Sequence, residues 1–353
     1  MPRATGQIFA RTRRLCSRGR WATIAAMSLL LGLSLLLAPA EAPVATNVWA
    51  EAGGRPWTLC REFERQAGAL LVRASQRADE SPGEVAWAQR ARDCPGAPAV
   101  LVVAALRELR KVPAYPPLID LKDALPRLGE AQRKARVQAQ TWLAQAQVEA
   151  ARRGEPPPPL THYLVAQAAL GLGDPKAARR ALARAEARGE VESWRAEQAG
   201  AVAALLAGDL QRALELGYRA RELAPGGERQ TAVYVLALIY DRAGAPEAAA
   251  RELSALGTAR FGYERGAVDT LLPLPERLYL GALEEQARRN PGNARLLWEA
   301  YLACPEPEEP ERRLVERRLA ELRPRGSVVP TSPGSEGRYH LLILTPSAPQ
   351  LQL

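Results

Sequence analysis

The chain has 353 residues, of which 47% are hydrophobic and 25% are charged, so it is long enough for one elongated domain or two compact ones. Aromatic residues make up only 5%, and the strong helix formers alanine and leucine dominate the apolar residues. The net charge of +9 falls to +3 (9 minus 6) without the six arginines of residues 1–40, a stretch that has no acidic residue. The remaining arginines and glutamates are intermixed, whereas a nucleic-acid surface needs clustered cations. Composition therefore predicts an all-α protein and argues against nucleic-acid binding.

The N-terminus has the layout of an export signal. Six arginines precede an uncharged apolar segment, residues 21–38, and the small-x-small sequence Ala38-Pro39-Ala40 follows it. This order is typical of a cleavable secretory signal peptide. A segment of about 18 residues also reaches the lower limit for crossing a bilayer. The alternative is therefore that residues 1–40 stay attached as an inner-membrane anchor. In both cases the arginines stay in the cytoplasm, and we expect the rest of the chain in the periplasm or cell envelope of a bacterium.

An N-terminal helical region follows a linker of small residues at 41–55. This region spans residues 56–153, and its apolar spacing predicts helices at 57–77, 82–94, 97–111 and 128–153. Decayed copies of the repeat described below are one interpretation of it. The prolines at 156–159 cannot be helical and predict a stiff turn, with a ligand for proline-recognition domains as the alternative.

Three cysteines lie beyond the export segment: Cys60, Cys94 and Cys304. Cys60 is near the start of the first predicted helix and Cys94 at the end of the second, and in an antiparallel pair those ends approach each other. An exported compartment permits a disulfide between them. The first helical arm is about five residues longer than the second, a mismatch of roughly 8 Å, so three buried thiols are the alternative.

Turn residues recur from Leu160 onward. Gly173-Asp174, Gly208-Asp209 and Gly244-Ala245 are spaced by 35 and 36 residues. Small residues follow at fixed distances within the next predicted helix, at Ala178, Ala185, Ala213, Ala220 and Ala249. Glycine ends a helix in the left-handed conformation, and aspartate caps the next helix. Alanine lets two antiparallel helices approach closely, so the pattern predicts stacked helical hairpins that complete one another's cores.

These residues resemble a known repeat family. The segment GDLQRALELGYRARELAP, from Gly208 to Pro225, is similar to the second half of a tetratricopeptide repeat, with Gly-Asp at the turn, two small positions and a terminal proline. The resemblance covers residues 160–305, although the aromatic residue expected early in the first helix is missing from each copy. The turn expected between the third and fourth copies, residues 257–273, is longer than usual. The resemblance implies an all-α solenoid, a superhelix of antiparallel helix pairs.

The C-terminal part changes composition twice. Residues 309–323 predict a charged amphipathic helix that caps the solenoid. Residues 324–353 predict a flexible tail with one short strand at 339–345. That strand is interpreted as part of a disordered tail, as a strand donated to a partner's sheet edge, or as a segment that folds back onto the helices.

Residues for catalysis are scarce. The only histidines, His162 and His340, lie in different regions, and no glycine-rich phosphate loop is present. The acidic run at 306–311 alternates with proline and predicts a solvated loop. We therefore expect no enzyme activity, no catalytic residue, no metal and no small-molecule cofactor.

In tetratricopeptide arrays the first helix of each pair lines a concave groove. The resemblance therefore implies a groove lined by Tyr163, Gln167, Arg195, Gln198, Val202, Tyr234, Leu238, Asp241 and Arg242. This mixture suits a helical or extended peptide with apolar anchors, and packing between helices is the alternative role for the same residues.

We expect an exported or membrane-tethered scaffold that binds a protein or peptide partner in the cell envelope. The alternatives are a structural subunit of an envelope assembly, such as a motility or secretion complex, and a helical enzyme with an unrecognised site.

Overall fold

The computed structural model describes residues 55–76, 86–111, 115–256, 263–305 and 309–322. Within these residues there are fourteen α-helices, α3 to α16, two short 3-10 helices and no strand. The all-α character predicted from composition is confirmed for this part of the chain. The chain divides into two compact units, Met1–Leu59 and Cys60–Leu353, and the description below concerns the second.

The first helices are α3 (Arg55–Gln76), α4 (Trp87–Asp93) and α5 (Pro98–Arg110). Helix α5 is the most apolar of them, and ten of its residues, from Pro98 to Leu109, are buried. A disulfide joins Cys60 of α3 to Cys94 at the end of α4, with 5.6 Å between their Cα atoms. Helices α3 and α4 are therefore linked covalently.

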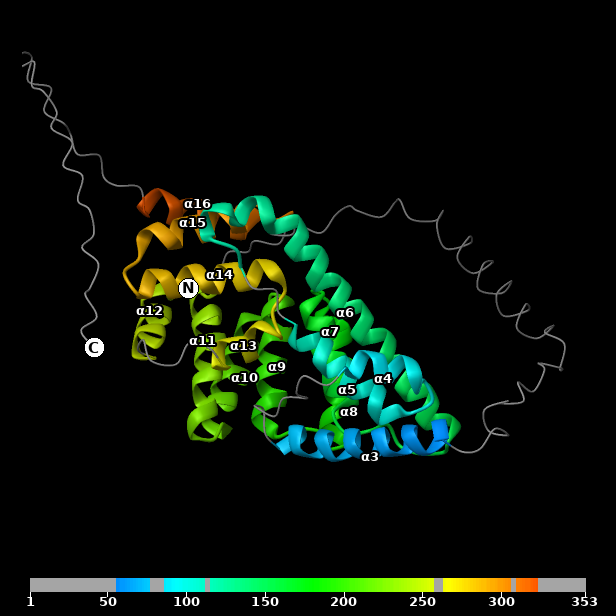
Figure 1. Ribbon diagram of the computed structural model, residues 1–353. Coiled ribbons are helices and arrows are strands. Elements are labelled where there is room, and N and C mark those ends of the chain that lie inside the picture. The colour runs from blue at the N-terminus through cyan, green and yellow to red at the C-terminus, as the bar shows by residue number, and fades with distance from the viewer. Residues whose placement is uncertain (1–54, 77–85, 112–114, 257–262, 306–308, 323–353) are drawn as a thin grey trace, which may run out of the picture. The chain divides into compact units, whose positions relative to one another are not determined.

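Helix α6 (Leu121–Arg152) is the longest helix of the described residues and follows the 3-10 turn η1 (Leu118–Asp120). It was predicted to begin at residue 128, but it begins at Leu121 and continues through Pro126. Burial of Leu121 and Leu125 explains the earlier start, because their packing outweighs the hydrogen bond that Pro126 cannot donate. Helix α6 packs on α5 and α7 and reaches α14 and α15 (Figure 1).

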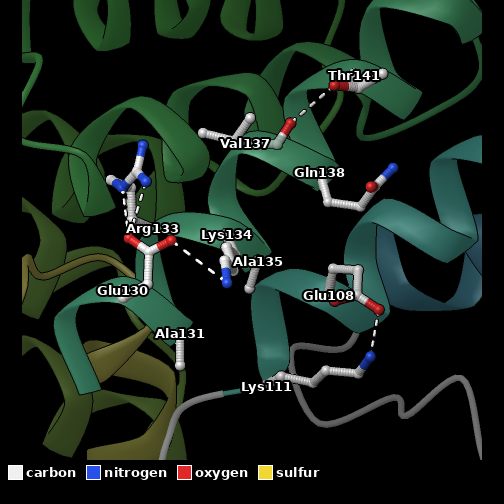
Figure 2. Close-up of a pocket in the computed structure, with 10 residues that line it drawn as sticks. All are labelled: Glu108, Lys111, Glu130, Ala131, Arg133, Lys134, Ala135, Val137, Gln138 and Thr141. Atoms are coloured by element: carbon white, nitrogen blue, oxygen red, sulfur yellow. Dashed lines mark hydrogen bonds and ion pairs between the residues drawn. The ribbon is translucent and has the colours of Figure 1, made fainter. Parts of the chain in front are cut away.

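A shallow cavity of about 900 Å³ lies along the outer side of α6, beside the end of α5. Figure 2 shows its lining, with the Glu108–Lys111 pair at one edge and Glu130 paired with Arg133 and Lys134 at another. Val137 and Thr141 of α6 line the same cavity. The part of α6 that lines this cavity is thus charged at residues 130–134 and uncharged from Val137 to Thr141.

Three helical hairpins follow in sequence. They are α7 (Thr161–Gly171) with α8 (Pro175–Ala187), α9 (Ser193–Leu206) with α10 (Leu210–Leu223), and α11 (Arg229–Arg242) with α12 (Pro246–Ala255). A second 3-10 turn, η2 (Gly226–Glu228), follows Pro225 and precedes α11. Each hairpin also contacts the next, through α8 with α9 and α10 with α11.

The turns of these hairpins have the backbone that their residues favour. Gly173, Gly208 and Gly244 have φ values of 74°, 77° and 80°, in the left-handed region where glycine carries no Cβ penalty. Asp174 accepts a hydrogen bond from Ala177 N at 2.9 Å, and Asp209 accepts one from Arg212 N at 3.1 Å. Each aspartate caps the helix that follows its glycine.

Small residues allow close helix packing between and within the hairpins. The alanines at the predicted small positions are all 0–1% exposed: Ala178, Ala185, Ala213, Ala220 and Ala249. A Cβ added to Gly217 of α10 would lie only 2.8 Å from a methyl carbon of Leu236 on α11. An alanine at this position would therefore require the buried Leu236 side chain to shift.

The C-terminal helices are α13 (Tyr263–Asp269), α14 (Leu274–Ala287), α15 (Pro291–Ala303) and α16 (Glu309–Leu322). Helices α14 and α15 form another hairpin, and α16 packs on α15. The stretch expected to be a long turn before α14 contains helix α13. It also supplies three buried apolar residues, Val268, Leu271 and Leu272, all at most 2% exposed.

Several predicted segments lie outside the described residues. They are the signal or anchor segment 21–38, most of the linker, residues 323–353 and the strand expected at 339–345. No helix of the part that the structure describes is both long enough and apolar enough to cross a membrane.

Candidate functional site

The residues expected to line a groove are inside the protein. Their side chains are all at most 9% exposed: Tyr163 and Gln167 on α7; Arg195, Gln198 and Val202 on α9; Tyr234, Leu238, Asp241 and Arg242 on α11. Other helices of the same chain cover these residues, so they do not form the expected open groove. Arg242 alone among them also lines a cavity, which is described below.

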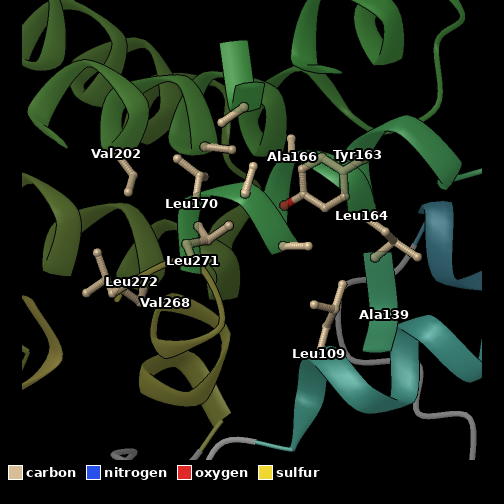
Figure 3. Packing of buried hydrophobic residues seen from close by; sticks show 14 of the residues in the cluster. Leu109, Ala139, Tyr163, Leu164, Ala166, Leu170, Val202, Val268, Leu271 and Leu272 are labelled. Atoms are coloured by element: carbon tan, nitrogen blue, oxygen red, sulfur yellow. The ribbon is translucent and has the colours of Figure 1, made fainter. Parts of the chain in front are cut away.

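Apolar residues from three other segments fill the space in front of the first helices. Figure 3 shows Leu170 of α7 and Val202 of α9 beside Leu271 and Leu272. Tyr163 and Leu164 of α7 lie beside Leu109 of α5 and Ala139 of α6 in the same cluster. The connection before α14 and the packing of α5 and α6 therefore explain why the predicted groove is closed.

Among the polar members of the buried set, Arg195 bonds to another helix and Gln167 bonds within its own. Arg195 donates to the carbonyl oxygen of Ala74 at 2.9 Å, in the last turn of α3, and its guanidinium lies 5.0 Å from the centre of the Tyr163 ring. A cation at a helix C-terminus satisfies free carbonyls and opposes the helix dipole. Gln167 donates to the Tyr163 hydroxyl at 3.4 Å. Arg195 therefore joins α9 to α3.

Asp241 and Arg242, at the end of α11, belong to a network that we call the ion cluster: Asp241, Arg242, Glu276, Tyr279, Tyr301, Glu311 and Arg318. Tyr279 donates to Asp241 Oδ2 at 2.5 Å, and Arg318 of α16 pairs with the other oxygen of Asp241. The Asp241 side chain is completely buried. It therefore depends on these two partners for compensation of its charge.

Arg242 is the centre of the ion cluster. Its NH2 nitrogen lies 2.8 Å from Glu276 Oε1, and its NH1 nitrogen lies 3.0 Å from Glu311 Oε1. The guanidinium sits 4.0 Å from the centre of the Tyr279 ring and donates to the Tyr301 hydroxyl at 3.2 Å. One side chain thus links α11 to α14, α15 and α16.

Burial and charge shift the ionisation of this cluster. Burial lowers the pKa of Arg242, but Glu276 and the other neighbouring acidic groups together outweigh this effect, and the pKa of Arg242 rises. Burial raises the pKa of Glu276, an effect that Arg242 opposes and Glu311 reinforces. Burial also raises the pKa of the Tyr279 and Tyr301 hydroxyls, so both keep their protons and act as donors or acceptors.

The ion cluster forms one wall of a cavity of about 880 Å³, which we call the turn cleft. The other walls come from the first half of α6, from two repeat turns at residues 171–173 and 205–208, and from the adjoining ends of α14 and α15. Leu172 and Leu206 lie at these turns, and both are half-buried. The cleft therefore borders the hairpin turns, away from the covered face of the first helices.

The lining of the turn cleft is suited to binding. Leucines, prolines and glycine backbone provide apolar surface, while Lys122, Arg133 and Arg242 are matched by Glu130, Glu276 and Glu311. Cys304 is also in the lining, but it is only 4% exposed and its thiol donates to Ala300 O. Such a pocket can hold an apolar peptide segment that carries charges of both signs.

Sequence reasoning missed the acidic partners of Arg242. Glu276 sits in the apolar run LLPLPERLYLGAL, and an isolated charged pair in such a run is a signal for a buried ion pair. Glu311 belongs both to the acidic run expected as a solvated loop and to the helix predicted at 309–323, and it lies in the first turn of α16 and pairs with Arg242. A buried cation that needs a counterion explains that placement.

Comparison of the chain with protein-family models, with curated proteins and with solved structures found no match. The tetratricopeptide resemblance therefore stays a prediction, carried by the glycine turns and the paired alanines.

Proposed function

We propose that this protein is an exported, tetratricopeptide-like helical scaffold that binds a protein partner in the bacterial cell envelope. The observation that carries the proposal is the turn cleft, which brings two repeat turns, the ion cluster and α6 around one cavity. Solenoid proteins bind partners on surfaces that several repeats build together.

The disulfide supports the expected location. Cys60 and Cys94 are 34 residues apart in sequence and are joined in the structure. Disulfides persist mainly in oxidising compartments such as the periplasm. This agrees with the export segment predicted at residues 21–38, which would release the chain or tether it to the membrane.

Because other helices cover the face of the first helices, the proposed binding site lies elsewhere. A partner cannot reach Tyr234 or Leu238 without displacing the chain's own helices. The turn cleft instead offers half-buried leucines with charges at its edge, which suits a short peptide segment with apolar anchors. We propose no small-molecule cofactor, metal or nucleic acid as a ligand.

Pull-down of the full chain from its native envelope tests this proposal. Leu206→Lys places a charge in the turn cleft and is expected to abolish recovery of the specific partner. Leu223→Lys is the matched control, because Leu223 is a leucine of the next helix that is 54% exposed and outside the cleft lining. Equal recovery by both variants contradicts binding in the turn cleft.

A structural subunit of an envelope assembly is the second candidate. The observation that favours it is the exposed neutral side of α6, where Val137 and Val148 are 45% and 50% exposed. If this candidate holds, Leu206→Lys leaves the assembly intact, and charges on the outer side of α6 disrupt it.

A further inference from the structure

The middle of α6 has an exposed face without charge. Residues 137–148, VQAQTWLAQAQV, contain no charged residue, although 25% of the chain is charged. Val137 and Val148 are 45% and 50% exposed, and Thr141 and Ala144 between them are exposed as well. Spacings of four, three and four residues place these side chains on one side of the helix. We call Val137, Thr141, Ala144 and Val148 the α6 outer face.

The inner side of the same stretch already has its partners. Ala139, Trp142, Leu143 and Ala146 are at most 8% exposed and belong to the hydrophobic core. Amphipathic helices normally present charged residues on the solvent side, whereas interface centres are depleted of charge. The α6 outer face, which adjoins the cavity of Figure 2, has the composition of an interface.

The stretch reads nearly the same in both directions. Its symmetric pairs about the point between residues 142 and 143 are Val137 with Val148, Gln138 with Gln147, Ala139 with Ala146, and Gln140 with Gln145. Val137, Val148 and Gln138 are exposed and Gln147 is half-buried, whereas the two alanines belong to the core. A two-fold interface needs a surface that is complementary to itself. Valine facing valine meets this need, and so do glutamines, because each amide both donates and accepts hydrogen bonds. Charged residues would repel their own copies.

We propose that the α6 outer face binds a second copy of this chain as an antiparallel helix pair with a two-fold axis between Thr141 and Ala144. In this arrangement Val137 meets Val148 of the partner subunit, and the small side chains of Thr141 and Ala144 allow close approach at the centre. The same register places Lys134, at the charged end of the stretch, opposite Ala151 of the partner subunit, so no like charge faces this lysine.

The contact is short. Twelve residues of helix span about 18 Å at roughly 1.5 Å per residue, which is small for a permanent interface. We therefore expect a weak dimer and not a permanent one. Dimerisation is independent of the turn cleft, so this inference goes beyond the proposed function.

Sedimentation equilibrium of the full chain, in detergent if the N-terminal segment is retained, tests the inference. A monomer–dimer equilibrium is expected, and Val148→Glu raises its dissociation constant at least tenfold. The matched control is Val72→Glu on α3, since Val72 is a valine of similar exposure, 48%. A chain that stays monomeric at several hundred micromolar, or equal effects of the two variants, overturns the proposal.

A charge exchange tests the two-fold geometry. Ala144→Glu and Ala144→Lys each place like charges near the axis, so each variant alone is monomeric. Mixing the two variants restores the dimer, because the charges become opposite. Failure of the mixture to associate overturns the two-fold arrangement. Dimerisation only of a chain that ends at Leu322 overturns the proposal in favour of the chain's own tail as the occupant.

Discussion

Arg318 of α16 pairs with Asp241 of α11, a residue 77 positions earlier whose side chain is completely buried. This contact joins α16, the last described helix, to the C-terminal end of α11, which is the first helix of the third hairpin. With Arg242, Glu276 and the partly exposed Glu311, it links α11, α14 and α16 through ion pairs. Such pairs are stabilising only as intact sets, because removal of one partner leaves a buried charge without compensation.

We therefore expect Asp241→Ala to lower the free energy of unfolding by about 3 kcal/mol, as is typical for breaking a buried ion pair. Urea denaturation measures this loss. The control is Arg313→Gln on α16, the helix that carries Arg318. This variant removes an exposed ion pair with Glu309, and no measurable change in the free energy of unfolding is expected. A double-mutant cycle of Asp241 and Arg318 with no coupling energy would contradict the structure.

Two glycines within helices give opposite predictions. A Cβ at Gly217 would lie 2.8 Å from Leu236, so Gly217→Ala lowers the free energy of unfolding by about 1–3 kcal/mol. A Cβ at Gly68 of α3 meets nothing within 4 Å. Gly68→Ala is therefore expected to raise the free energy of unfolding by roughly 0.5–1 kcal/mol, because alanine has the better helix propensity. Thermal denaturation of both variants checks the signs, and a stabilising Gly217→Ala would be inconsistent with close packing of α10 on α11.

Fold features that depend on nearby residues could be predicted from the sequence. Alanine and leucine content gave the helical class, and the glycines at 173, 208 and 244 lie at turns with left-handed backbone. Features that depend on distant partners could not. The stretch that contains α13 was expected to be a turn, so packing between helices was only the alternative role for Val202 and Leu238, which are buried. Helical period identifies a buried face, but it does not reveal which helix covers that face.

The disulfide predicts a dependence of stability on redox conditions. The bridge closes a loop of 34 residues, which the chain-entropy model values at about 3–4 kcal/mol. Urea midpoints with and without dithiothreitol measure the effect. The Cys304→Ala variant should show the same difference, because that thiol is a buried free cysteine. A chain that is insensitive to reductant would show that the bridge does not form.

Tyr115 predicts a loss of stability in alkali. Burial raises its pKa to about 12, an effect that Arg277 partly opposes. Above pH 10 the unfolded chain releases this proton while the folded chain retains it, so stability falls between pH 10 and 12, by about 2 kcal/mol. Tyr115→Phe removes this part of the loss. It is expected to be at least as stable as the wild type at pH 7, because the buried hydroxyl has no hydrogen-bond partner among the described residues. Parallel pH–stability curves for the two proteins would contradict the assignment.

Site-specific photo-crosslinking in the native envelope tests the scaffold proposal most directly. A photoreactive residue at Leu172 or Leu206, both in the turn cleft, is expected to capture the same partner protein. The same residue at Leu223, exposed on α10 outside the cleft lining, should not capture it. Capture from Leu223 but not from Leu172 or Leu206, or no partner from any of them, would contradict a scaffold that binds through the turn cleft.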